Sequence, residues 1–222
     1  MLYEVVVNDW GETTYVPTTL GNILLAALII VFLVAGVALA QKNNAKKITV
    51  KQLVFCALSV ALATVLSYIK VFKFPTGGSI TLLSMLVICL PGYFFGLGTG
   101  IMAGIAYGLL QMLVDPYILY PLQLLVDYPL AFGALGLAGM FHNAKHGLIK
   151  GYILGILGRY AFAVISGYVF FGMYAWDGWA ALPYSLVYNA IYIFAEAALT
   201  IAIISIPAVK KSMMQIKTMA NS

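Results

Sequence analysis

Three polar residues share a hydrophobic stretch near the middle of the chain: Tyr120, Gln123 and Asp127. Their spacing of i, i+3 and i+7 places them on one face of a helix. A carboxylate inside a membrane span is costly, since insertion scales put an aspartate at a helix centre near about +3 kcal/mol. We therefore interpret Asp127 as a functional residue that faces a cavity. The simpler alternative is a polar group satisfied by a neighbouring helix.

A polar stripe also crosses the last apolar run of the chain. It is expected to face the interior of a helix bundle and to meet Asp127 there. Together, a carboxylate, tyrosine rings and amides suit a small aromatic ligand with a positive charge. The stripe consists of Ser185, Asn189, Tyr192 and Glu196, with Tyr184 and Tyr188 beside it.

Other chemistry is sparse. Arg159 and Glu196 lie at similar depths in their spans, and we expect them to form an ion pair. His142 and His146 fall in a polar loop without a third metal ligand, and no P-loop, nucleophile-elbow or zinc-protease motif occurs. The sequence therefore predicts neither an enzyme nor a cofactor.

The composition requires a membrane protein. Of the 222 residues, 63% are hydrophobic and only 9% are charged, and the mean hydropathy is +1.00. This size allows one bundle of six or seven helices and no separate soluble domain. The expected spans are 20–40, 53–69, 80–90, 95–114, 118–140, 148–173 and 184–208, with Pro91-Gly92 as a turn and 70–79 as a loop.

The lysines predict the orientation of the bundle in the cell membrane. Seven spans put the lysine-rich loop 41–51, the loop around Lys145 and Lys150, and the basic tail on one side. The positive-inside rule makes that side cytoplasmic, so the N-terminus lies outside and the C-terminus inside. The net charge of +5 then reflects the bilayer, and no nucleic-acid partner is expected.

Small residues recur at helical spacing. The glycines from Gly92 to Gly108 repeat every four residues, which predicts a helix that packs closely against another backbone. Ala57 and Ala61 form a small pair on an earlier span.

Several segments, in order, resemble the substrate-binding S components of energy-coupling factor transporters, and among these the thiamine-specific type. The resemblance covers 52–222 and implies a six-helix binding domain there, with 1–51 as an extra transmembrane helix and basic linker. The segments are Ala57-x3-Ala61, PTGGS at 75–79, YPLQLLVDYPLAFGALGLAG at 120–139, RYAFAVISGYVFFG at 159–172 and YAWDGW…YSLVYNA at 174–190.

The resemblance also implies a ligand and partners. The ligand is thiamine, and the partners are a membrane scaffold subunit that docks on Ala57 and Ala61 and two ATPase subunits. Ala163 stands where this type has a histidine, and Phe171 where some members have a tryptophan. The expected ligand-binding residues are Asp127, Tyr117, Tyr120, Gln123, Phe171, Tyr184, Asn189, Gly77, Gly78 and Ser79.

Two other readings stay open at this point. The chain can be a self-sufficient secondary transporter of thiamine or a related cation, with Asp127, Arg159 and Glu196 as a proton or cation relay. It can also be a structural membrane protein without a small ligand. The S-component reading requires ATPase partners, whereas the secondary transporter and the structural protein do not.

Overall fold

The structure is a computed structural model of the chain, and it describes residues 3–7, 13–20, 23, 27, 48–74 and 78–222. Most of the predicted span 20–40 lies outside these residues, and so does Gly77. The extra N-terminal helix therefore stays a prediction.

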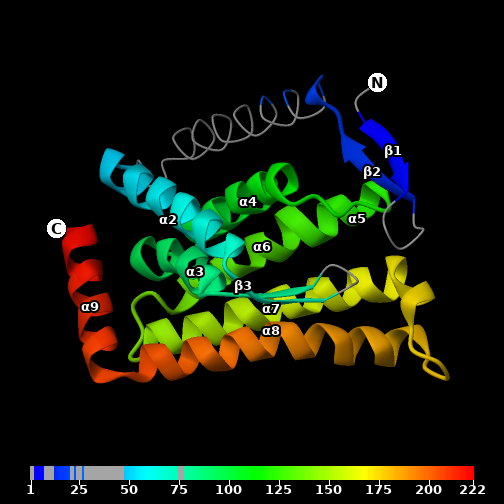
Figure 1. The fold of residues 1–222 in the computed structure, drawn as a ribbon. Helices are drawn as coiled ribbons and strands as arrows, with labels where there is room; N and C mark the ends of the chain where they lie inside the picture. Colours follow the sequence, from blue (N-terminus) through cyan, green and yellow to red (C-terminus); the bar gives the residue numbers. More distant parts are fainter. Residues whose placement is uncertain (1–2, 8–12, 21–22, 24–26, 28–47, 75–77) are drawn as a thin grey trace.

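Apolar helices dominate the described part, which confirms an all-α membrane protein. Within that part, five helical segments are long and apolar enough to cross a membrane, and α3 is a shorter apolar helix. Helices α7 and α8 run alongside each other in Figure 1, and α9 lies across one end of the bundle. The main helices are α2 (Val50–Tyr68), α3 (Ser84–Phe95), α4 (Leu97–Val114), α7 (Gly147–Phe170), α8 (Ala181–Ser205) and α9 (Pro207–Asn221), with the short η3 (Gly172–Tyr174) after α7.

The segment that carries Asp127 is helical but irregular. It consists of α5 (Pro121–Leu125), the π-helix η1 (Val126–Leu130), α6 (Ala131–Gly133) and the 3-10 helix η2 (Ala134–Phe141). Pro129 lies within η1 and has no N–H, so it removes one donor from the regular α-helical ladder. The altered pitch changes which residues share a face of this segment.

Two short hairpins accompany the helices. Strand β1 (Tyr3–Val7) pairs antiparallel with β2 (Thr13–Pro17), and β3 (Lys70–Lys73) pairs antiparallel with β4 (Ser79–Thr81). The predicted loop over 70–79 is thus wrong, because its ends form strands. The β-branched and aromatic residues of KVFK and SIT favour that conformation. The β3–β4 hairpin leads directly into α3.

Glycines bring α4 close to the irregular segment. A Cβ atom on Gly104 would lie 2.4 Å from the carbonyl oxygen of Phe132, and one on Gly108 would lie 2.4 Å from that of Tyr128. No side chain fits such a gap without a shift of the backbone. The prediction of close helix packing through the glycine repeat is confirmed.

The turn within this repeat lies elsewhere than predicted. Helix α3 continues through Pro91 and ends before Gly96, whose φ of +98° favours glycine. Gly92 serves packing instead, since a Cβ atom there would lie 2.9 Å from the Gly139 nitrogen. A single proline inside a helix removes only one hydrogen bond, which the packed neighbours offset.

We expect Gly104→Ala to destabilise the protein by about 2 kcal/mol, because the added methyl group overpacks the contact with Phe132. The midpoint of thermal unfolding in detergent measures this loss. Gly98→Ala is the matched control on the same helix, since nothing lies within 4 Å of its added Cβ atom. The control should be neutral, or stabilise by up to about 1 kcal/mol. Equal destabilisation of both variants would contradict the packing argument.

Candidate functional site

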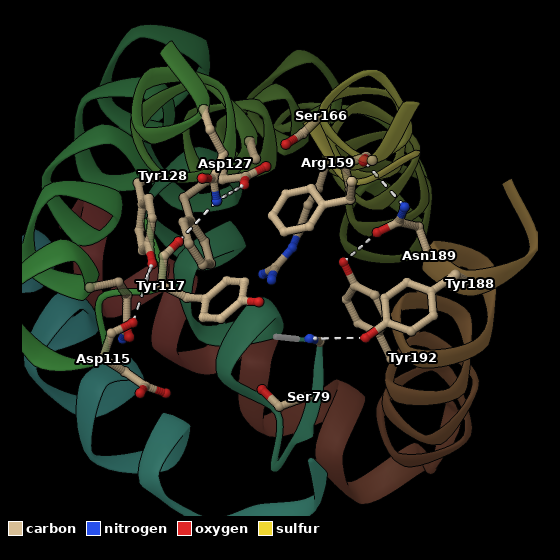
Figure 2. Close-up of a pocket in the computed structure, with 18 of the residues that line it drawn as sticks. Ser79, Asp115, Tyr117, Asp127, Tyr128, Arg159, Ser166, Tyr188, Asn189 and Tyr192 are labelled. Atoms are coloured by element: carbon tan, nitrogen blue, oxygen red, sulfur yellow. Dashed lines mark hydrogen bonds between the residues drawn. The ribbon is translucent and has the colours of Figure 1, made fainter. Parts of the chain in front are cut away.

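A cavity of about 370 Å³ lies between the helices near one end of the bundle, which we call the pocket end. Its walls come from α4, the segment around Asp127, α7, α8 and the β3–β4 hairpin (Figure 2). The lining residues are Lys73, Gly78, Ser79, Gln111, Asp115, Pro116, Tyr117, Gln123, Asp127, Tyr128, Ala131, Phe132, Arg159, Ala163, Ser166, Gly167, Phe171, Tyr184, Tyr188, Asn189 and Tyr192.

Asp127 is held in place by Gln123. The Nε2 group of Gln123 donates to Oδ2 of Asp127 at 2.9 Å and to the Tyr117 carbonyl oxygen at 2.9 Å. Its Oε1 accepts from the Leu119 N–H at 2.7 Å. Both ends of the amide are therefore used inside the protein, and the carboxylate keeps a fixed direction at the cavity wall.

Tyr120 does not line the cavity. It precedes the first residue of α5 with an extended backbone, at φ −139° and ψ 143°, so the helical spacing that relates it to Gln123 does not apply. Its ring instead stacks with Phe170 at a centroid distance of 5.7 Å and is 39% exposed. Tyr120 is the one predicted ligand-binding residue in the described part of the chain that does not line the cavity.

The polar stripe of α8 faces inward, as predicted. Ser185, Asn189 and Glu196 are all at most 5% exposed. Asn189 donates to the Ala163 carbonyl oxygen of α7 at 3.2 Å, and its Oδ1 accepts from the Tyr192 hydroxyl at 2.6 Å. The first bond ties α7 to α8, and the second, within α8, helps to orient the amide at the cavity.

Aromatic rings form two opposite groups around the cavity. Tyr117 and Phe171 stack with centroids 6.0 Å apart and planes inclined by 17°. Tyr184 and Tyr188 lie on α8 with ring centroids 5.4 Å apart. A flat ligand between these groups would meet π-faces and also hydroxyl groups.

The expected ion pair between Arg159 and Glu196 is not formed. No ion pair within 4.0 Å joins these two described residues, and Glu196 accepts hydrogen bonds from the Thr81–Met85 segment instead. Arg159 lies over the Phe132 ring at 4.2 Å from its centroid and points into the cavity (Figure 2). The error arose because equal depth along two helices does not fix the direction of their side chains.

Sequence reasoning therefore missed Arg159 as a lining residue. It placed Tyr192 in the α8 stripe and Tyr188 beside it, but it named neither of them as a ligand-binding residue. Tyr184, Tyr188 and Tyr192 follow one another at intervals of four residues, which places all three tyrosines on one helical face, and this signal could have identified them. No cluster of three potential metal ligands occurs among the described residues.

Comparison with known proteins identifies the family. A family profile described as thiamine transporter protein (Thia_YuaJ) matches residues 53–216. The thiamine transporter ThiT of Bacillus subtilis is 32% identical over 166 residues, which are 68% of this chain and 85% of that protein. The thiamine transporter ThiT of Lacticaseibacillus paracasei is 31% identical over 128 residues, 50% of this chain and 64% of that protein.

A solved structure of ThiT from Listeria monocytogenes has the same fold. It matches with a TM-score of 0.58 and 28% identity, covering 77% of this chain and 93% of that chain. All lining residues of the cavity fall inside the region matched by the family profile. The chain therefore belongs to the thiamine transporter protein family.

Proposed function

We propose that the cavity binds thiamine and that the chain delivers it, as an S component, to an ATP-driven energy-coupling factor complex. The observation that carries this proposal is the carboxylate of Asp127, fixed by Gln123 at the wall of an aromatic cavity. Thiamine joins a neutral aminopyrimidine ring to a cationic thiazolium ring. A half-buried carboxylate offsets the desolvation of that cation, and tyrosine rings stack on both ring systems.

Residues around Asp127 supply the remaining recognition in this proposal. Tyr117 and Phe171 offer a stacked pair on one side, and Tyr184 and Asn189 offer a ring and an amide on the other. Gly78 and Ser79 of the hairpin complete the wall. Gly77 lies outside the described residues, and its role stays a prediction.

The proposed architecture is a six-helix binding domain at 52–222. It comprises α2, α3, α4, the α5–η2 segment, α7 and α8. We place the pocket end outside the cell, because the basic helix α9 and the start of α7 lie at the opposite end (Figure 1). Lys145 precedes α7, and Lys150 lies in its first turn. The residues 1–51 form the extra helix and basic linker in this arrangement.

A thiamine titration of the purified chain in detergent tests the proposal. Trp176 serves as the reporter, since its ring centroid lies 5.3 Å from that of Tyr184 in the cavity wall. We expect saturable fluorescence quenching by thiamine at concentrations up to low micromolar. A folded protein that shows no response to thiamine, by fluorescence or by calorimetry, would overturn the assignment of the ligand.

Phe171 provides a sharper test of the ring contacts. We expect Phe171→Ala to weaken thiamine binding about 5-fold, since an aromatic pair contributes roughly 1 kcal/mol beyond the area it buries. Phe170→Ala is the matched control, because Phe170 stacks on Tyr120 outside the cavity. Dissociation constants from the same titration measure both variants. If the control lost as much affinity as Phe171→Ala, general disruption of the end of α7 would explain the loss.

A further inference from the structure

Glu196 carries a buried carboxylate that thiamine recognition does not use. It lies on α8, is 2% exposed, and does not line the cavity. Its Oε2 accepts from the N–H of Thr81 at 2.8 Å and from the hydroxyl of Thr81 at 2.7 Å. Its Oε1 accepts from the N–H of Met85 at 3.2 Å and from the hydroxyl of Ser84 at 3.5 Å.

These donors belong to the junction between strand β4 and helix α3. Leu83, just before α3, has a φ of 61°, which is an unfavourable conformation for a residue with a side chain. Backbone N–H groups at a helix start have no partner within the helix, and membrane interiors offer no water to satisfy them. A carboxylate at this place satisfies several donors together and is favoured by the positive end of the helix dipole. The junction is therefore fixed to α8 at one point.

The same hairpin also forms part of the cavity wall. Gly78 and Ser79 lie two to three residues before Thr81, and both line the cavity. The Gly78 N–H donates to the hydroxyl of Tyr188 at 3.3 Å, as the dashed line in Figure 2 shows. A Cβ atom on Gly78 would lie 2.7 Å from the ring of Tyr192. Helix α8 thus holds the hairpin through Tyr188 and Tyr192 near its tip and through Glu196 at its base.

Strand β3 makes a further contact that restrains the β3–β4 hairpin. Lys70 of β3 forms an ion pair with Asp115 at 2.5 Å, and these side chains are 26% and 50% exposed. Solvent screens a pair of this kind, so it contributes less than the buried contacts of Glu196. The position of the hairpin relative to α8 therefore depends mainly on the junction and the tip.

From these contacts we infer that Glu196 is a positioning residue of the ligand site. It holds β4 against α8, so that Gly78 and Ser79 cover the cavity, and it thereby slows the departure of the ligand. The part of this inference that concerns the ligand rests on the proposed binding of thiamine. The part that concerns the hairpin stands on the hydrogen bonds alone.

Glu196→Gln tests the inference with little change in volume. The glutamine keeps one acceptor oxygen, but its NH₂ group cannot accept from the Met85 N–H or the Ser84 hydroxyl. We expect hydrogen exchange in 70–74 and 78–85 to become at least about 10-fold faster in the ligand-free protein, while exchange in α7 stays unchanged. Thiamine dissociation should accelerate by about the same factor, with its association rate unchanged.

Thr200→Val is the matched control, one turn further along α8. Thr200 is fully buried, and none of the hydrogen bonds or ion pairs described for the hairpin involves it, so its replacement should leave exchange and dissociation as in the wild type. Faster exchange throughout the chain of Glu196→Gln would overturn the inference, because it would indicate a general loss of stability. Unchanged hairpin exchange would also overturn it. Faster hairpin exchange in a protein that binds no thiamine would support the positioning role and reject the proposed ligand.

Discussion

Asp127→Asn is expected to weaken thiamine binding by about 100-fold or more. The substitution keeps the shape of the side chain and one oxygen that accepts from Gln123 Nε2. It removes the negative charge from a cavity that also contains the Arg159 guanidinium. Removing one member of a desolvated charge pair typically costs 2–5 kcal/mol, which is roughly 30-fold to several thousand-fold in affinity. Calorimetric titration of the purified variant with thiamine measures the loss.

Two comparisons separate the charge from other effects of this substitution. Asp177→Asn removes a carboxylate from the exposed connection before α8 and should leave the affinity unchanged. A neutral thiamine analogue that lacks the thiazolium charge should bind the wild type and Asp127→Asn with similar affinity. Wild-type affinity of Asp127→Asn for thiamine would show that the carboxylate does not contact the cation. The proposed site would then be wrong.

The helices of this protein are largely predictable from sequence, since the bilayer imposes long apolar segments with polar connections. Five of the seven expected spans correspond to helices long and apolar enough to cross a membrane in the described residues, and 80–90 corresponds to the shorter α3. The α8 stripe and the close packing of the glycines were predictable for the same reason. Each depends on residue spacing within a single regular helix.

The failures at the site involve local departures from a regular helix or contacts between distant segments. Tyr120 lies outside the cavity because the helix starts one residue after it. The π-helix at Val126–Leu130 further changes the register around Asp127. Periodicity arguments assume an unbroken 3.6-residue repeat, and neither departure has a distinct hydrophobic pattern.

Glu196 illustrates the second kind of failure. Its partner Thr81 is 115 residues away in the sequence, in a hairpin whose strands have only four and three residues. A carboxylate in a membrane span demands a partner, and Arg159 was the nearest candidate of opposite charge. Two backbone N–H groups and two hydroxyl groups of the Thr81–Met85 segment are the partners of Glu196 instead. Backbone N–H groups are present at nearly every residue, so residue types alone cannot reveal which of them a carboxylate meets.

The exposed face of α2 leads to the second large expected effect. Ala57 and Ala61 lie on this face, and only Ser59, Ala63 and Ser67 of the helix are buried. A pair of small residues allows another helix backbone to approach closely, and we propose that the scaffold subunit docks there. We expect the double substitution Ala57→Trp and Ala61→Trp to abolish thiamine uptake by cells and co-purification with the scaffold and ATPase subunits. Thiamine binding by the isolated chain should stay within about twofold of the wild type, since neither alanine lines the cavity.

A matched pair on another helix controls for the bulk of the new side chains. Ala198 and Ala202 are also exposed and four residues apart, but on α8. Tryptophan at both of these positions should leave uptake and co-purification intact, because α8 is not the proposed docking helix. Uptake that survives the α2 substitutions would contradict docking on this face. If that uptake also persisted without the ATPase subunits and collapsed with a protonophore, a secondary transporter would replace the S component as the explanation, since a proton gradient would then supply the energy.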